Sequence, residues 1–244
     1  MFLVIDIGNT WQKAAIFNAK GELTDLFQSR LLSPEELQPL LARHTVQAAI
    51  ISSVGNTHPQ LSEWLSGQMR TLTFSSRLRL PLSIGYHTPE TLGTDRIAAA
   101  IGANALYANT PVLVIQAGTC LVTDFVSHDN EYQGGSISPG LRMRCAALPH
   151  FTAHLPLVEP RQPTPLTGQT TEESILSGTV NGFLYEVEGY IRQYQAQYPD
   201  LITLLTGGDA PLLSGLIKNR IFAAPNLVLL GLFKTLILNV SETQ

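Results

Sequence analysis

Two stretches of the chain, LVIDIGNT at 3–10 and LVIQAGTC at 113–120, are nearly identical in sequence. Each is an apolar run typical of a buried strand, ends in a glycine turn and leads into a second strand-like run. An internal repeat constrains the fold strongly, because each copy predicts the same structural unit. The sequence therefore predicts an α/β protein of two duplicated halves with a cleft between them, divided at 1–108 and 109–244.

The pattern around each copy predicts three strands in an antiparallel meander. Helices are expected at 33–44, with Ser33 as N-cap, at 58–69, and after the glycine of LGTDR. Strands are expected at 47–54 and 201–206. The segment 171–198 has helical spacing, as one helix or as two with a break near Gly178–Gly182, and the Pro/Thr-rich segment 159–171 predicts a surface loop.

Composition limits the classes of function. The chain is 44% hydrophobic and 14% charged, which indicates a well-packed globular protein. A net charge of −4 offers no basic face for nucleic acid, and no apolar run is long enough to span a membrane. The two cysteines lack metal-site spacing, and a histidine pair at 150 and 154 has no third ligand nearby, so no zinc site is expected. A cytoplasmic protein is the resulting expectation.

The glycine turns suggest phosphate binding. A turn of type D-x-G-N-T can point successive backbone N–H groups at phosphate oxygens, and Asp6 at the strand end could hold Mg²⁺ through water. Lys13 would add a cation facing the phosphates. A plain hairpin explains one such turn equally well. Two matching turns and a third, TGGD at 206–209, favour a phosphotransferase instead.

A carboxylate for the acceptor hydroxyl is present in LGTDR at 92–96. The structural interpretation is a helix start with Thr94 or Asp95 as cap and Arg96 in solvent. The functional interpretation makes Asp95 a general base and Arg96 a clamp for an anionic acceptor. The residues alone leave both open.

Six motifs in order, DIGNT, Y…LGTDR, QAGT, GGSISPG, TTEESILSG and TGGD, resemble type III pantothenate kinases of the acetate and sugar kinase/Hsp70/actin superfamily. The resemblance runs from Phe2 to about Leu232. It implies two ribonuclease H-like domains of the duplicated actin-like ATPase fold and a homodimer. The implied reaction is ATP-dependent phosphorylation of pantothenate to 4′-phosphopantothenate, the first step of coenzyme A biosynthesis.

The resemblance also implies roles for individual residues. Asp95 would be the catalytic base, and the acceptor would meet Tyr86, Gly93, Thr94, Asp95, Arg96 and Thr171. ATP would meet Asp6, Ile7, Gly8, Asn9, Thr10, Trp11, Gln12, Lys13, Gly118, Thr119, Gly207 and Gly208. The second half would also supply the adenosine-side turn and the dimer helices.

One position departs from the family pattern. The second turn of the family usually begins with an aspartate associated with K⁺ or NH₄⁺, whereas this chain has Gln116. Weaker cation dependence, replacement of the cation by the amide, and reduced activity are all open, and Asp124 on the next strand could compensate. Two rival functions follow: a non-catalytic nucleotide- or pantothenate-binding homologue, and a kinase for another small alcohol. Retention of Tyr86, LGTDR and Thr171 argues against the second.

Overall fold

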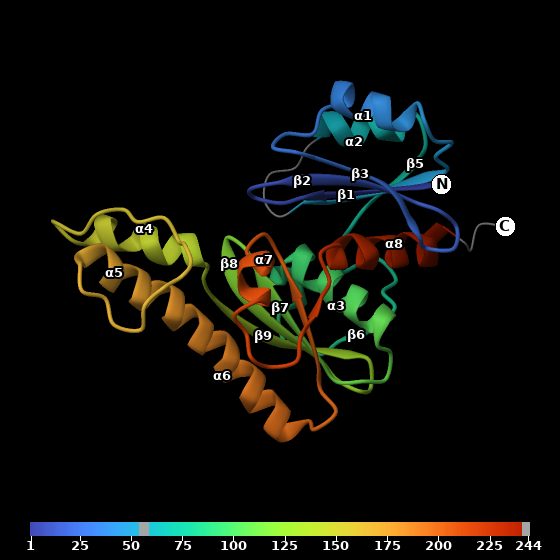
Figure 1. Ribbon diagram of the computed structural model, residues 1–244. Helices are drawn as coiled ribbons and strands as arrows, with labels where there is room; N and C mark the ends of the chain where they lie inside the picture. Colours follow the sequence, from blue (N-terminus) through green and yellow to red (C-terminus); the bar gives the residue numbers. More distant parts are fainter. Residues whose placement is uncertain (54–58, 241–244) are drawn as a thin grey trace. The chain divides into compact units, whose positions relative to one another are not determined.

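The computed structural model describes residues 1–53 and 59–240, which fold into two compact units (Figure 1). Unit 1 comprises Met1–Asn109, Val126–Gln133 and Asn226–Gln244, and unit 2 comprises Thr110–Phe125 and Gly134–Pro225. Val54 of the expected strand and His58 of the expected helix lie outside the described residues.

The first sheet has the order β3-β2-β1-β4-β5. Its strands are β1 (Phe2–Ile7), β2 (Gln12–Phe17), β3 (Leu23–Ser29), β4 (Ala48–Ser53) and β5 (Arg70–Thr73). β1 pairs antiparallel with β2 and parallel with β4. The three antiparallel strands are the meander that the sequence predicts.

The second sheet repeats this order. Its strands β7 (Val112–Ala117), β8 (Cys120–Val126), β9 (Glu131–Pro139), β10 (Ile202–Thr206) and β11 (Phe222–Ala223) form the series β9-β8-β7-β10-β11. β6 (Ser83–Ile84) pairs with the first residues of β9, within unit 1. The sequence repeat therefore corresponds to a repeated topology, and the duplicated α/β fold is confirmed.

The apolar run of β1 is buried on both faces, so its residues alternate between two cores. Leu3, Ile5 and Ile7 pack against α1 (Pro34–Leu41) and α2 (Pro59–Ser66). Phe2 and Val4 pack against α3 (Thr94–Leu106) and α8 (Leu227–Val240). Figure 1 shows α1 and α2 on one side of this sheet and α8 on the other. Odd-numbered side chains of β1 therefore point to the face covered by α1 and α2, and even-numbered side chains point to the face covered by α3 and α8.

Helix starts are set by local chemistry. Ser33 caps α1 by accepting the backbone N–H of Glu36, as expected. For α3, the expectation of Thr94 or Asp95 as cap is wrong: the N-cap is Gly93, and no side chain caps the helix. The helix begins one residue earlier because the Thr94 hydroxyl is bonded to β4, where it donates to the Ser53 carbonyl.

α3 and α8 pack closely because each has a glycine at the contact. A Cβ on Gly102 would lie 2.2 Å from the Leu227 carbonyl oxygen, and one on Gly231 would lie 1.8 Å from that of Ala98. Either distance is far inside van der Waals contact, so both positions require glycine. The last described helix therefore fixes the helix that carries Asp95.

Unit 2 has a long helical run at its edge, drawn in orange in Figure 1. α5 (Thr171–Leu176) and α6 (Gly182–Gln197) are joined by a π-helical segment, Ser177–Asn181. The break expected near Gly178–Gly182 is this π segment, and the chain continues through it as helix. α4 (Leu141–Phe151), which the sequence analysis did not assign, precedes the expected loop, and α7 (Ala210–Ser214) follows β10. Among the described residues, no helix combines the length and the apolar character needed to cross a membrane.

Candidate active site

Asp6 lies near the end of β1 on the face that holds Phe2 and Val4, which is the face covered by α3. Its Oδ1 atom is buried and has no hydrogen-bond partner among the described residues. Burial, and secondly the charge of Asp95, raise the pKa of Asp6 to about 6, and Lys13 opposes this shift. An unpaired buried carboxyl oxygen is costly for folding and indicates a site that awaits a ligand.

Strand register gathers three polar side chains in one row. Asp6 pairs with Lys13 of β2 and with Ser52 of β4, so all three lie on the α3 face of the sheet. Ser52 Oγ donates a hydrogen bond to Thr94 Oγ1 over 3.1 Å. This bond ties the first residue of α3 to the strand ends, and it explains why Asp95 is close enough to raise the pKa of Asp6.

Asp95 occupies the first turn of α3. Its Oδ1 accepts the backbone N–H of Arg96 over 2.9 Å. A Cβ on Gly93 would lie 2.7 Å from the same oxygen, so the glycine of LGTDR leaves room for the carboxylate. The motif therefore positions an acid side chain at the helix start beside Asp6.

Arg96 lies beside two tyrosine rings that also contact each other, with ring centres 6.0 Å apart. Its guanidinium carbon is 5.8 Å from the ring centre of Tyr86 and 5.9 Å from that of Tyr132, and only 6% of the residue is exposed. The structure thus joins two of the expected acceptor residues and adds Tyr132, which the sequence analysis missed. Tyr132 is a buried position in the alternating pattern of β9, which is the signal that could have identified it.

The first glycine turn is tight. The Gly8 N–H donates to the Trp11 carbonyl over 3.2 Å, and a Cβ on Gly8 would lie 2.9 Å from that oxygen. Asn9, Thr10 and Trp11 are exposed at the turn. Gln12 points to the opposite face from Lys13, where its Oε1 accepts the Leu32 N–H over 2.6 Å. The Gln12 side chain is therefore held on the face of the first sheet that α1 covers.

The other turns lie in unit 2. The Gly118 N–H donates over 3.0 Å to the carbonyl of Cys120, two residues on, so this turn is shorter than the first, where the bond spans three residues; Thr119 is exposed. Gly207 has φ +99°, and a Cβ there would lie 2.2 Å from the Ala117 carbonyl oxygen. Gly207 therefore lies against the end of β7 only because it lacks a side chain, whereas a Cβ on Gly208 would meet nothing within 4 Å.

Gly140 is a further residue of this turn that the sequence analysis did not single out. Its N–H donates to the Thr119 carbonyl over 3.1 Å, and a Cβ on it would lie 2.2 Å from the Gly118 carbonyl oxygen. The last glycine of GGSISPG thus supports the second turn.

Gln116 occupies in β7 the place that Asp6 has in β1. Its Nε2 donates to Oδ2 of Asp124 on β8 over 3.4 Å, and Asp124 is fully buried. In the part of the chain that the structure describes, no three His, Cys, Asp or Glu side chains gather as a metal site would require.

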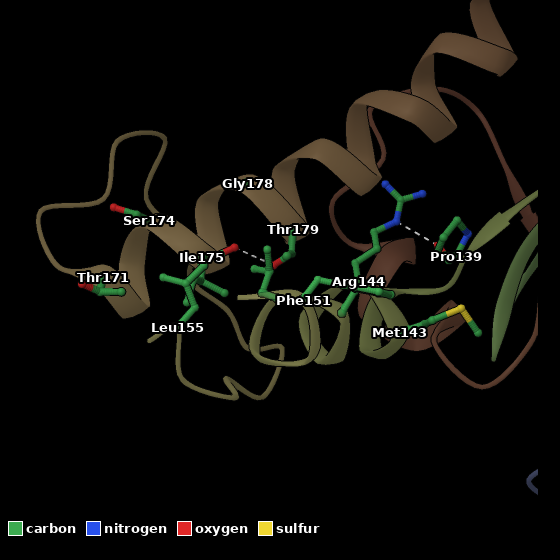
Figure 2. Close-up of a pocket in the computed structure, with 12 residues that line it drawn as sticks. Pro139, Met143, Arg144, Phe151, Leu155, Thr171, Ser174, Ile175, Gly178 and Thr179 are labelled. Carbon is green, nitrogen blue, oxygen red and sulfur yellow. Dashed lines mark hydrogen bonds between the residues drawn. The ribbon is translucent and has the colours of Figure 1, made fainter. Parts of the chain in front are cut away.

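Thr171 lines an apolar groove of about 780 Å³ whose lining residues all belong to unit 2, whereas Asp95 belongs to unit 1. Figure 2 shows the groove walls, which come from α4, α5 and the π segment. Arg144 donates through Nε to the Pro139 carbonyl over 2.8 Å and forms an ion pair with Glu186. These contacts hold α4 at the end of β9.

The chain is similar to known proteins over nearly its whole length. A family model described as type III pantothenate kinase matches residues 2–193. A type III pantothenate kinase of Phocaeicola vulgatus is 43% identical over 98% of this chain and 99% of its own length.

Solved structures match the same two-unit topology. A Baf family protein of Campylobacter jejuni has a TM-score of 0.61 at 22% identity, over 98% of this chain and 99% of its own. A polyphosphate/ATP-glucomannokinase of an Arthrobacter strain has a TM-score of 0.51 at 15% identity, over 97% and 98%. At these identities the two structures support the actin-like ATPase fold alone. The family match over residues 2–193 and the 43% identity show more than the fold. The chain belongs to the type III pantothenate kinase family, and it is an ATP-dependent kinase of pantothenate.

Proposed function

We propose that this enzyme transfers the γ-phosphoryl group of ATP directly to the 4′-hydroxyl of pantothenate, with Asp95 as general base. The observation that carries the proposal is the pair of carboxylates at the start of α3 and the end of β1. Asp6 pairs with Ser52, and Ser52 is bonded to Thr94 next to Asp95, so both carboxylates lie at the same end of the sheet; in agreement, the charge of Asp95 raises the pKa of Asp6. Direct transfer to a hydroxyl needs one carboxylate to orient the acceptor and another group to neutralise phosphate charge.

The two carboxylates have different environments, which supports different roles. Asp95 lies in the first helical turn, where its Oδ1 accepts one backbone N–H. Asp6 is partly buried, and its Oδ1 atom is buried and unpaired among the described residues. An unpaired buried carboxylate oxygen fits Mg²⁺, which prefers one or two carboxylates together with phosphates and water. When bound, Mg²⁺ neutralises phosphate charge.

We assign the phosphates of ATP to the two glycine turns, through Gly8 to Lys13 and through Gly118 and Thr119. Both turns begin with a glycine and follow a central strand of their sheet, which supports this assignment. Gly207 and Gly208 would serve the adenosine side. The division into ribonuclease H-like halves at 1–108 and 109–244 belongs to the same proposal, because strands β1–β5 and β7–β11 fall on either side of that division.

We assign the acceptor to Tyr86, Gly93, Thr94 and Arg96, with Thr171 as a further contact. The guanidinium of Arg96 lies beside two tyrosine rings, and its planar fork suits a carboxylate such as that of pantothenate. A cytoplasmic location is proposed with this function, since ATP is the phosphoryl donor.

We further propose a homodimer that uses the groove beside α4. Phe151 and Met143 line it and are 80% and 41% exposed, and apolar side chains on this scale usually mark an interface. Sedimentation of Phe151→Glu against wild type tests this: a shift from dimer to monomer supports the interface, and an unchanged dimer contradicts it.

The central test is Asp95→Asn, with Asp129→Asn as control because the side chain of Asp129 is 77% exposed. A lost general base lowers kcat by about 10²–10⁴-fold. Binding of ATP and pantothenate, measured by calorimetry, is retained. Turnover equal to wild type in Asp95→Asn would refute the assignment.

A further inference from the structure

The Gln116–Asp124 pair is the place where this chain departs from its family pattern. Both side chains lie on the face of the second sheet opposite Leu113, Ile115 and Ala117, which pack in the unit 2 core. Asp124 is 0% exposed, so its carboxylate depends on partners within the protein. The Gln116 amide nitrogen at 3.4 Å is one of them.

The orientation of the amide follows from chemistry. With the opposite orientation, the Gln116 carbonyl oxygen would face the Asp124 carboxylate, and two acceptors would be in contact without a proton between them. The NH₂ end is therefore the end that the buried carboxylate requires. It carries partial positive charge and presents it to Oδ2.

An aspartate at position 116 would create a different site. Two carboxylates on neighbouring strands of one face would repel each other, and a cation between them would relieve the repulsion. Gln116 removes one of these charges and supplies a donor to the other. A bonded amide–carboxylate pair is a poor donor set for a cation, which needs several oxygen ligands with free lone pairs. The residues present therefore do not fit a monovalent cation.

We propose that the Gln116 side-chain amide occupies the place of a monovalent cation beside the second glycine turn, so that this kinase needs neither K⁺ nor NH₄⁺. Gln116 is a positioning residue here: it satisfies Asp124 and holds the end of β7, two residues before Gly118. The kinetic part of this inference rests on the proposed phosphotransfer. The structural part, a site satisfied without an ion, is independent of it.

The first experiment measures pantothenate-dependent ADP release in tetramethylammonium, potassium and ammonium chloride at one ionic strength. Tetramethylammonium is too large to fill a small cation site. Equal rates in the three salts support the proposal. Activation of the wild type by K⁺ of about tenfold, equivalent to 1.4 kcal/mol, would overturn it.

The second experiment restores the carboxylate with Gln116→Asp. We expect this variant to gain what the wild type lacks: its rate in tetramethylammonium falls about tenfold below its rate in K⁺. Its thermal midpoint should rise with K⁺ concentration, as binding to the folded state alone requires. Gln38→Asp, at an exposed position of α1, is the control for the substitution and should show neither effect. A Gln116→Asp variant that ignores K⁺ in both measurements would contradict the proposal.

The two failures are distinguishable. If the wild type releases no ADP in any salt, the proposed phosphotransfer fails, and the thermal midpoints still test the pair. A wild-type midpoint that rises with K⁺ but not with tetramethylammonium would show a working cation site and refute the inference. If Gln116→Asp does not fold, the wild-type midpoints alone decide the question.

Discussion

Replacing Asp6 by asparagine should stabilise unit 1 at neutral pH while abolishing catalysis. The pKa of Asp6 rises from 3.8 to about 6 in the folded protein, chiefly through burial. A pKa difference of this size corresponds to about 3 kcal/mol of unfavourable free energy when the carboxylate is fully ionised. Asparagine removes that charge and nearly preserves the shape.

The sign of the pH dependence follows from which state holds the proton. Between pH 3.8 and about 6 the folded state binds a proton at Asp6 that the unfolded state has released. The contribution of Asp6 to stability is therefore fully present below pH 3.8 and is lost as the pH rises through about 6. The cost of the wild-type carboxylate should be about 3 kcal/mol at pH 8 and about 1.5 kcal/mol at pH 5.

The assay is urea unfolding of wild type and Asp6→Asn from pH 5 to pH 8, followed by tryptophan fluorescence. The chain has two tryptophans, Trp11 and Trp64, and both lie in unit 1, so the signal reports the unit that contains Asp6. The difference in unfolding free energy between variant and wild type at any one pH includes the contacts of the new amide. The change of this difference with pH does not include them. The stability gap between variant and wild type should widen by about 1.5 kcal/mol from pH 5 to pH 8.

A gap that stays constant over this pH range would refute the reasoning, because it would mean that Asp6 titrates alike in both states. Asp129→Asn serves as the control for removal of an exposed carboxylate. Kinase activity of Asp6→Asn should be lost at every pH, since the proposed Mg²⁺ ligand is gone.

Two further substitutions test other parts of the site. Arg96→Lys replaces a planar guanidinium that lies beside the rings of Tyr86 and Tyr132, so KM for pantothenate should rise about tenfold or more while KM for ATP stays unchanged; equal effects on both substrates would speak against the acceptor role. Gly207→Ala places a Cβ 2.2 Å from the Ala117 carbonyl oxygen at φ +99°, so it should destabilise unit 2 by about 2 kcal/mol or more in urea unfolding. Gly208→Ala, which meets nothing within 4 Å, is its matched control, and equal losses in the two variants would exclude the steric cause.

The repeat made most of the fold predictable. LVIDIGNT and LVIQAGTC each end a strand in a glycine turn that leads into the next strand, although the first turn is longer than the second. The family resemblance implies two ribonuclease H-like halves, and the series β3-β2-β1-β4-β5 and β9-β8-β7-β10-β11 repeat one strand order. Ser33 was predictable as a cap because its hydroxyl lies three residues before the N–H that it accepts.

Other features depend on contacts between distant segments, which no local pattern reveals. Tyr132 reaches Arg96 only after β9 folds beside β6, and Gly140 supports the second turn only through the path of the chain after β9. α4 was missed because Pro149 near its end reads as a helix breaker. For Gln116 the sequence identified the unusual position and Asp124 as a neighbour. Only the hydrogen bond distinguishes among the consequences that the sequence left open.

The packing of α8 on α3 has a consequence for biosynthesis. Unit 1 is discontinuous: its first 109 residues need the segment from Asn226 onward to complete their core. A ribosome makes α3 long before α8. While unit 2 is being synthesised, Ile97 and Ile101 of α3 and the face of β1 that holds Phe2 and Val4 therefore lack the cover that α8 provides. During that interval the exposed apolar face is a target for chaperones and a risk for aggregation. Catalytic competence therefore arrives late in translation, when the helix that locks Asp95 into place has emerged.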